Sequence, residues 1–335
     1  MTSHEARRST VSVVIPCRDE VAVLPRLVEV LGRQTLQPDE VVVADGMSGD
    51  GTRLLLADLA AADPRVVVVD NPGRTVPAAM NVLVARATSD YVARMDTHAE
   101  YADDYLEAVV DVLDREAGAV AVGSAMTTAG RGPWGRAIAA VLARPLGLGG
   151  ASHRVGGPAG PVPHVFSGCY RRAAVLEAGG WDERLHANED FEADQRVGRL
   201  GSILLEPSAR STWYVRETPR ALAVQMWRYG FYKGLTLHLH PDSLKARQLA
   251  PPAVVAGLVT SIAVRPRLGL QLLGAYLLVA GAAGAKAAAT DAAAPWRGAV
   301  VPPVVHLSWG AGLLAGLLRF AGVPRQPVGP GGSAA

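Results

Sequence analysis

The sequence VSVVIPCRDE, at residues 11–20, decides the fold class of this chain of 335 residues. A short run of β-branched residues closed by a proline is typical of a buried strand, and the next eleven residues carry apolar side chains at helical spacing. The same alternation recurs downstream, which indicates an α/β fold with a mainly parallel sheet and helices on both faces. Strands are expected at residues 11–16, 40–44, 65–70, 91–95 and 119–124, and helices at residues 21–31, 52–62, 77–87 and 105–115.

Polar and small side chains stand at the ends of three expected strands. They are residues 16–20 (PCRDE), 45–52 (DGMSGDGT) and 94–98 (RMDTH). Because ligands bind at the carboxyl ends of the strands in such sheets, we expect the three segments to line one crevice. No G-x-G-x-x-G loop follows the first strand and no G-x-x-x-x-G-K-[ST] occurs, which disfavours a Rossmann dehydrogenase and a P-loop NTPase. Carboxylates in those places favour a diphosphate held through a divalent metal ion.

The composition narrows the class of protein further. The chain has 33 Lys and Arg against 31 Asp and Glu, a net charge of +2. A nucleic-acid binder usually carries a marked basic excess, so no nucleic-acid partner is expected. The two cysteines, Cys17 and Cys169, are too few for a disulfide scaffold and have no zinc-site spacing. The apolar run at residues 11–17 is too short for a signal peptide, so we expect this domain in the cytoplasm.

Four segments resemble, in order, the motifs of family 2 glycosyltransferases of the GT-A fold. They are residues 13–20 (VVIPCRDE), 42–52 (VVADGMSGDGT), 94–98 (RMDTH) and 179–190 (GGWDERLHANED). The resemblance covers roughly residues 11–240 and is nearest to membrane-attached transferases of bacterial exopolysaccharide assembly, of the succinoglycan type. It implies inverting transfer of a sugar from a nucleotide-diphosphate donor, a UDP-sugar, to a lipid-linked or polysaccharide acceptor in cell-envelope or exopolysaccharide biosynthesis.

The resemblance also implies a donor site at the strand ends. It makes Asp45 the acceptor for the uracil N3–H, although an aspartate in this place can also simply cap the following turn. Arg74 follows another strand end and is expected either to touch the nucleotide or to be a solvated loop cation. Contacts to the base or ribose are expected from Pro16, Arg18 and Glu20.

The D-x-D motif of the family, which holds a divalent cation against the diphosphate, corresponds here to Asp96 and His98. The second carboxylate of that motif is therefore an imidazole. A neutral imidazole is a good ligand for Mn²⁺ and a poorer one for Mg²⁺, which prefers oxygen. We expect Asp96 and His98 to bind a divalent metal, with Mn²⁺ favoured over Mg²⁺, and Asp96 to face the donor.

The Glu189-Asp190 pair carries the chemistry in this interpretation. The acceptor hydroxyl must lose a proton as it attacks the anomeric carbon, and we expect Asp190 to accept that proton as general base. The neighbouring Glu189 helps, because adjacent anions raise one pKa. The alternative is that both acids merely begin a helix, since acids favour helix N-termini.

Two further segments are expected to meet the acceptor. The Gly- and Pro-rich residues 144–163 suit a lid whose Arg144 and Arg154 approach the diphosphate, or a flexible solvated loop. Residues 225–229 (QMWRY) echo the Q-x-x-R-W of processive synthases, which makes Gln225, Arg228 and Tyr229 acceptor-side candidates. The aromatic and basic side chains at 227–233 also suit a membrane interface.

The C-terminal third is mostly Ala, Leu, Val and Gly. Its apolar runs, 251–264, 268–285 and 300–318, are each at or below the roughly 20 residues that cross a bilayer. A buried Ala-rich helical domain is one interpretation, and the resemblance favours two or three membrane spans. The expected organisation is a disordered start (1–10), a GT-A catalytic domain (11–215), amphipathic interface helices (216–248), membrane helices (249–320) and a disordered tail (321–335).

Two other functions are compatible with parts of this pattern. A catalytically silent membrane scaffold that binds a nucleotide sugar or a partner enzyme is opposed by the intact Asp45, Asp96 and Asp190, although His98 leaves it open. A sugar-nucleotide pyrophosphorylase should have a Gly-rich loop after its first strand, and the sequence has none there.

Overall fold

The computed structural model describes residues 8–144, 147 and 157–324, and its sheet begins with the first four of the five predicted strands, which are parallel. These strands are β1 (Val11–Cys17), β2 (Glu40–Asp45), β3 (Val66–Asp70) and β4 (Tyr91–Arg94). β1 pairs with both β2 and β4, and β2 pairs with β3, all in parallel. The register places Cys17 beside Asp45, and Asp45 beside Asp70, so the predicted polar strand ends meet at one edge.

The rest of the sheet is mixed, in the order β3-β2-β1-β4-β8-β6-β9-β5. The long strands β6 (Ala119–Ala129) and β9 (Ser202–Tyr214) pair in parallel. Three short strands pair in the antiparallel sense: β8 (Cys169–Arg171) with β4 and β6, and β5 (Ala99–Tyr101) and β7 (Gly160–Pro161) with β9. The prediction of a mainly parallel α/β sheet is confirmed, with these antiparallel additions.

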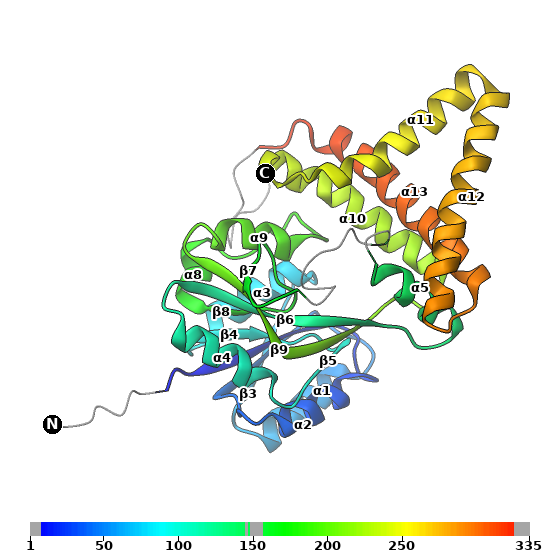
Figure 1. Cartoon of the computed structure of the whole chain (residues 1–335). Helices are drawn as coiled ribbons and strands as arrows, with labels where there is room; N and C mark the ends of the chain where they lie inside the picture. The colour runs from blue at the N-terminus through cyan, green and yellow to red at the C-terminus, as the bar shows by residue number, and fades with distance from the viewer. Residues whose placement is uncertain (1–7, 145–146, 148–156, 325–335) are drawn as a thin grey trace.

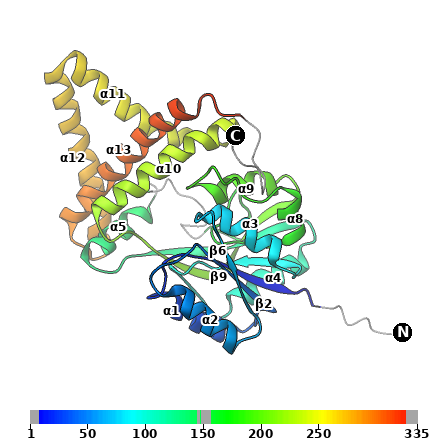
Figure 2. The same cartoon turned by 180° about the vertical axis from the view of Figure 1, so that it is seen from behind.

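Helices cover both faces of the sheet because its first strands are apolar on both sides. Val13 and Ile15 belong to one buried cluster, with side chains of α1, α2 and α4. Val14 belongs to the other cluster, with side chains of α3, α8 and α9 (Figures 1 and 2). The helix bounds are α1 (Leu24–Arg33), α2 (Thr52–Ala62), α3 (Val76–Arg86), α4 (Tyr105–Arg115), α5 (Pro133–Leu142), α8 (Arg172–Glu177) and α9 (Glu189–Val197).

Long helices make up the C-terminal third. They are α10 (Pro219–Leu239), α11 (Ala250–Val264), α12 (Pro266–Thr290) and α13 (Pro295–Phe320), with short 3₁₀ turns η1 (Pro241–Ser243) and η2 (Ala246–Leu249) after α10. α11 and α12 form a hairpin that projects from the rest of the molecule, and α13 returns alongside α10 (Figure 1). The predicted disordered ends, 1–10 and 321–335, lie for the most part outside the described residues.

α10 and α13 pack closely through a pair of glycines on each helix. A Cβ atom at Gly230 would collide with the backbone of Trp309, and one at Gly316 would collide with the backbone of Phe231. Gly234 and Gly312 complete two G-x-x-x-G pairs, a spacing that lets helix backbones approach closely. α10 therefore joins the sheet domain to the C-terminal helices through a packed interface.

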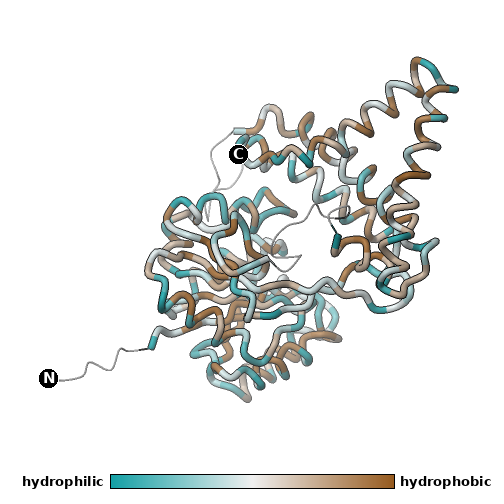
Figure 3. Tube along the Cα trace, viewed as in Figure 1, coloured by the Kyte–Doolittle hydropathy of each residue, from teal (hydrophilic) through white to brown (hydrophobic). Residues whose placement is uncertain are grey.

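Three C-terminal helical segments are long and apolar enough to cross a membrane: Ala246–Val264, Pro266–Thr290 and Pro295–Phe320. Only 6% of the residues in the apolar window of the first segment are buried, and 22% in the second. Figure 3 shows apolar residues along the projecting hairpin. A buried Ala-rich domain would cover these residues, whereas Leu278 at the middle of α12 is 74% exposed. The exposed apolar surface therefore favours the interpretation as membrane spans, and three helices are long and apolar enough for it.

We expect the full-length protein to stay with membranes after washing with carbonate or high salt, because spanning helices are held by apolar burial. Leu278→Lys should reduce this retention, since a lysine at a span centre costs about 2.5–3.5 kcal/mol. Leu54→Lys is the matched control, because Leu54 is 75% exposed on α2 of the sheet domain. Immunoblots of the membrane and soluble fractions measure both effects. Release of the wild-type chain by salt alone would contradict spanning helices.

Candidate active site

Asp45 is fixed at the end of β2. It is 1% exposed, and its carboxylate accepts hydrogen bonds from the Ser48 backbone N–H (3.3 and 3.2 Å) and from Arg53 Nη1 (2.8 Å). Arg53 Nη2 also donates to Asp70 at 2.9 Å. Asp45 thus caps the tight turn that follows it, which is one of the two roles expected for it. The same hydrogen bonds fix the direction in which the remaining lone pairs of its carboxylate point. The sequence gives no signal for the role of Arg53, because there it is simply a cation in the first turn of a helix.

The other expected donor-site residues lie around this turn. Arg18 packs against Gly46, and its Nη1 donates to the backbone carbonyl of Arg74 at 3.4 Å. Arg18 and Arg74 are exposed, and Arg74 has a positive φ of 54°. Two neighbouring guanidinium-bearing residues at the open edge of a sheet suit a phosphate or ribose ligand. Pro16 is half-buried at the end of β1, and Glu20 lies in the loop after it.

Asp96 follows β4 and is held on both oxygens. Oδ1 accepts from Arg94 Nε at 2.8 Å, and Oδ2 accepts from Ser167 Oγ at 3.0 Å. His98 lies nearby in sequence with its side chain 68% exposed, and its Nε2 is 2.9 Å from Glu20 Oε1. This contact with Glu20 raises the pKa of His98. The pairing of His98 with Glu20 links two of the predicted strand ends.

The residues at the ends of β1, β2 and β4 supply some, but not all, of the ligands that a divalent cation needs. Within the described ranges there is no group of three or more His, Cys, Asp or Glu side chains that could hold a metal by itself. Asp96 is partly exposed, and each of its oxygens accepts one hydrogen bond, which leaves lone pairs for a ligand. A cation held by one or two protein side chains and completed by substrate phosphates needs no larger group. Asp96 and His98 have the chemistry for such a site.

Arg94 connects the metal-motif aspartate to the predicted base. Its Nη1 donates to Oδ1 and Oδ2 of Asp190, each at 2.6 Å, while its Nε donates to Asp96. Trp181 Nε1 donates to Asp190 Oδ1 at 2.9 Å. Arg94 is buried, so both ion pairs are shielded from water. Arg94 lies within a motif of the sequence, but no role could be assigned to it there. Nothing in the local sequence indicates a partner 96 residues away.

Glu189 begins α9 beside Asp190. Burial and the neighbouring Asp190 charge raise the pKa of Glu189 to about 7. The direction of this shift is the one expected of adjacent acids, and the catalytic roles of Glu189 and Asp190 stay predictions. Both acids also lie in the first turn of α9, where the helix dipole favours negative charge. The alternative that the two acids merely begin a helix therefore also fits their position.

Helix α9 is anchored on several sides. Glu192 is fully buried and pairs with Arg196 (2.6 Å) and with His240 Nε2 (2.9 Å) at the end of α10. Asn188, with a positive φ of 61°, donates from Nδ2 to the Tyr229 backbone carbonyl on α10 at 2.9 Å. The helix that carries the predicted base is therefore tied to the helix that packs on α13.

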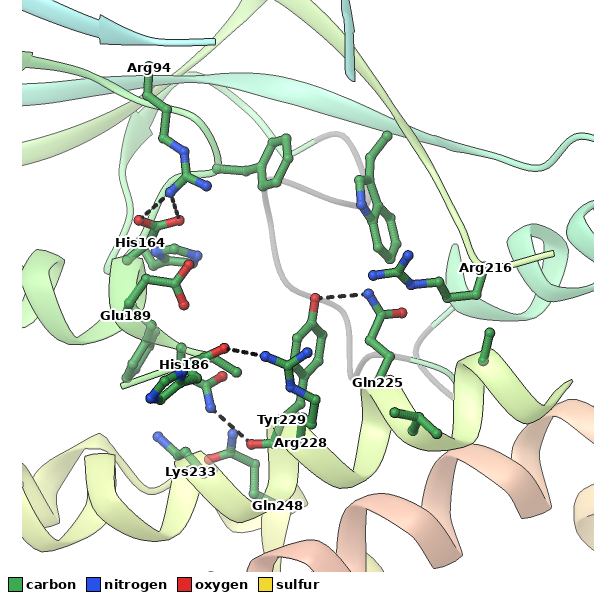
Figure 4. Close-up of a pocket in the computed structure, with 18 of the residues that line it drawn as sticks. Arg94, His164, His186, Glu189, Arg216, Gln225, Arg228, Tyr229, Lys233 and Gln248 are labelled. Atoms are coloured by element: carbon green, nitrogen blue, oxygen red, sulfur yellow. Dashed lines mark hydrogen bonds and ion pairs between the residues drawn. The ribbon is translucent and has the colours of Figure 1, made fainter. Parts of the chain in front are cut away.

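A cavity of about 750 Å³ lies between α9 and α10 (Figure 4). The acceptor-side candidates Gln225, Arg228 and Tyr229 all line it, together with Glu189 and Asp190. Gln225 Nε2 donates to the Tyr229 hydroxyl at 3.2 Å, and Arg228 Nη2 donates to the His186 carbonyl at 3.1 Å. The segment at residues 225–229, singled out from the sequence, therefore forms part of one wall of this cavity.

The structure describes only part of the expected lid at residues 144–163. Arg154 lies outside the described residues. Arg144 forms an ion pair with Asp291, between α12 and α13, with hydrogen bonds of 2.9 and 3.0 Å. Arg144 thus has a partner between the C-terminal helices in this structure, and its approach to the diphosphate stays a prediction.

Comparisons with known proteins identify the family of the chain. Residues 12–177 match the family described as glycosyl transferase family 2. The chain is 35% identical over 337 residues to the succinoglycan biosynthesis protein ExoA of Rhizobium meliloti (strain 1021), across 96% of this chain and 98% of that protein. It is 28% identical to the pre-mycofactocin glycosyltransferase of Mycobacterium tuberculosis, across 75% of this chain and 53% of that protein.

Two solved structures share the fold. The mannosyltransferase PcManGT of Pyrobaculum calidifontis, in complex with GDP-Man and Mn²⁺, aligns with a TM-score of 0.58 and 20% identity, across 95% of this chain and 88% of that one. GalNAc-T7 with UDP, GalNAc and Mn²⁺ aligns with a TM-score of 0.50 and 18% identity, across 71% of this chain and 52% of that one. At these identities the likeness establishes the fold, and both structures contain Mn²⁺.

Proposed function

The chain belongs to the family 2 glycosyltransferases, and from this premise we propose that it moves a sugar from a UDP-sugar to a lipid-linked or polysaccharide acceptor, with inversion, in cell-envelope or exopolysaccharide biosynthesis. The observation that carries the proposal is the link that Arg94 makes between Asp96 at the donor edge and Asp190 at the acceptor cavity. Direct displacement needs these two groups on opposite sides of one anomeric carbon. The likeness to ExoA supports the biosynthetic setting.

The nucleotide binds at the ends of β1 and β2 in this proposal. Asp45, held by Arg53 and Ser48, accepts a hydrogen bond from the base, and Pro16, Arg18, Glu20 and Arg74 surround the base and ribose. Asp96 faces the diphosphate. Arg18 and Arg74 add positive charge at an edge where the ligand is anionic.

Asp190 takes the proton of the acceptor hydroxyl. The Asp190 carboxylate has the acceptor oxygens that a proton needs, and Arg94 holds both of them. A hydroxyl becomes strongly acidic only as its oxygen bonds to the anomeric carbon, so Asp190 takes the proton late in the displacement. Arg94 and Trp181 also fix the direction in which Asp190 points.

A divalent cation bound by Asp96 and His98 would neutralise the charge that grows on the leaving diphosphate. Both fold relatives contain Mn²⁺, which supports a divalent metal. The preference for Mn²⁺ over Mg²⁺ rests on the imidazole of His98.

The cavity between α9 and α10 receives the acceptor. The membrane helices and the glycine-mediated contact of α10 with α13 would hold this cavity close to the membrane, where a lipid-linked acceptor resides. The catalytic domain faces the cytoplasm, where nucleotide sugars are made. Purified full-length protein should release the nucleoside diphosphate from at least one member of a panel of UDP- and GDP-sugars. No release from any member would contradict the proposed function.

Chelation tests the metal. EDTA should abolish transfer, and Mn²⁺ should restore it better than Mg²⁺. His98→Asp should shift the preference toward Mg²⁺, because it supplies a harder oxygen ligand. Rates at a series of metal concentrations measure the preference, and His186→Asp is a matched control because His186 lines the cavity instead of the donor edge. Transfer that is unaffected by EDTA would show that the cationic side chains alone neutralise the diphosphate.

A further inference from the structure

The first half of α13 packs against the sheet domain, although the helix is long enough for a membrane span. Val301 and Val305 belong to a buried cluster that also contains Ile138 of α5 and Val215, which directly follows β9. α5 comes soon after β6, and the ends of β6 and β9 are paired side by side. The start of α13 is therefore held where the two longest strands of the sheet end.

The other end of α13 returns to the same domain. The backbone carbonyl of Pro324, just after the helix, accepts a hydrogen bond at 3.2 Å from Arg184 Nη1, in the segment that precedes α9. The Val323 carbonyl lies 2.6 Å from Nε2 of His238 at the end of α10. The loops and charged side chains of the sheet domain exclude it from hydrocarbon, so the domain stays on one side of a bilayer. Both ends of α13 therefore lie on that side, whereas the ends of a transmembrane helix lie on opposite sides.

α13 also stays beside α10 to its last residue. The glycine pairs bring the two backbones together, and Phe320 at the end of α13 packs on Phe231 with 5.0 Å between the ring centroids. In both views this α10–α13 layer lies between the sheet and the α11–α12 hairpin, which leaves the layer on the side away from the sheet (Figures 1 and 2). The layer exposes Trp227, Leu317 and Leu318. Apolar and aromatic side chains on helices that lie flat suit the surface of a bilayer.

The free part of the hairpin is short for a bilayer. α11 has 15 residues, and all but one of the buried residues of α12 follow Val279. Each free arm is therefore about 21–22 Å long at a rise of 1.5 Å per residue, whereas the hydrocarbon core is about 30 Å thick. A helix in the interface sinks about 5–10 Å toward the acyl chains, so the α10–α13 layer at the foot of the hairpin supplies the difference.

The tip of the hairpin indicates a complete crossing. It carries Arg265 and Arg267, which are both exposed. A hairpin that ended at mid-bilayer would place two guanidinium groups in hydrocarbon, where they are costly. A hairpin that crosses brings them to the phosphates of the opposite leaflet, which guanidinium groups bind as bidentate partners.

We propose that the α11–α12 hairpin is the one part of the described chain that crosses the bilayer, and that the α10–α13 layer docks on the leaflet that faces the sheet domain. The end of α13 then lies on the same side as the sheet domain. Arg265 and Arg267 lie at the opposite leaflet. This inference is independent of the proposed function, because it concerns only where the lipid lies.

This arrangement makes the flanking cations unequal on the two sides. Lys245, Arg247 and Arg297 lie at the feet of the hairpin, on the side of the sheet domain, whereas the tip carries two arginines. An excess of Lys and Arg is typical of the cytoplasmic side of a membrane protein. The inferred topology therefore favours a cytoplasmic sheet domain.

Cysteine labelling tests the topology, because the native Cys17 and Cys169 are buried and should react little. Single cysteines are introduced into the full chain at three exposed positions: Leu54→Cys on α2, Gly322→Cys after α13 and Pro266→Cys at the hairpin tip. A Cβ atom at Gly322 meets nothing within 4 Å, so this variant should keep the fold. A membrane-impermeant maleimide is added to intact cells of the expression host and to permeabilised cells, and labelling is read from gels.

Leu54→Cys and Gly322→Cys should be labelled only after permeabilisation, whereas Pro266→Cys should be labelled in intact cells. The wild-type chain gives the background, and Ala321→Cys repeats the measurement beside Gly322. Labelling of Gly322→Cys and Ala321→Cys from the side opposite to Leu54→Cys would overturn the inference, because α13 would then span the bilayer. Labelling of Pro266→Cys from the same side as Leu54→Cys, or only in detergent, would overturn the crossing hairpin. A fully reversed pattern would support the topology and overturn the cytoplasmic orientation.

Discussion

Asp190→Asn is expected to lower the rate of sugar transfer by about 10²-fold or more, in line with the loss of a general base. Asparagine has nearly the shape of aspartate, and its carbonyl oxygen can still accept hydrogen bonds from Arg94 and Trp181. It cannot take the proton of the acceptor hydroxyl. The affinity for UDP should stay near that of the wild type, because the proposed nucleotide site lies on the other side of Arg94. Transfer rates and UDP titration measure the two effects.

Glu189→Gln is the matched variant, since Glu189 precedes Asp190 on the same helical turn. It should cost much less activity than Asp190→Asn. If Glu189 is the base instead, the order of the two effects reverses. The wild-type rate would then rise with pH through about 7, because the raised pKa of Glu189 keeps it protonated below that pH. Full transfer activity in Asp190→Asn would contradict its role as base.

Arg94→Met should remove transfer almost completely and also lower stability by about 3–5 kcal/mol, the usual cost of leaving buried charges without their partner. Arg94 is buried and is the cation between Asp96 and Asp190, so its loss leaves two carboxylates facing each other. Arg94→Lys should recover only part of the activity, because an ammonium is a point charge and cannot serve both carboxylates in a fixed geometry. Thermal unfolding and transfer rates measure the two losses.

Arg33→Met provides the comparison for this loss of stability. Arg33 is exposed and its contact with Asp103 is 3.3 Å long. An exposed ion pair contributes roughly 0–1 kcal/mol, so this variant should unfold close to the wild-type temperature and keep its activity. Wild-type transfer by Arg94→Met would show that the link between the donor edge and the cavity is not needed.

The first strands could be predicted because their signal is local. β1 and β2 are short, mostly apolar runs buried on both faces, and each is followed by polar residues where the chain turns. β8 could not be predicted in the same way, because its three residues form a strand only between β4 and β6. α5 was also missed: most of its residues are buried, so its apolar residues show no single face.

The site residues also fall into those with a local sequence signal and those without one. Asp45, Asp96 and Asp190 could be proposed from short motifs, and the structure places them around Arg53 and Arg94. The roles of those two arginines depend on residues brought together by the sheet and by α9, so no spacing in the sequence reveals them.

The anomeric configuration of the first product tests the central claim most directly, because direct displacement with Asp190 as base inverts the anomeric carbon. Full-length protein is given an α-linked UDP-sugar that it turns over, and ¹H NMR spectra are recorded before the product can mutarotate. We expect the β-anomer first, whether the sugar passes to a glycoside or to water, and the same spectrum should develop about 10²-fold more slowly with Asp190→Asn. An α-anomer as the first product would contradict direct displacement and the role given to Asp190.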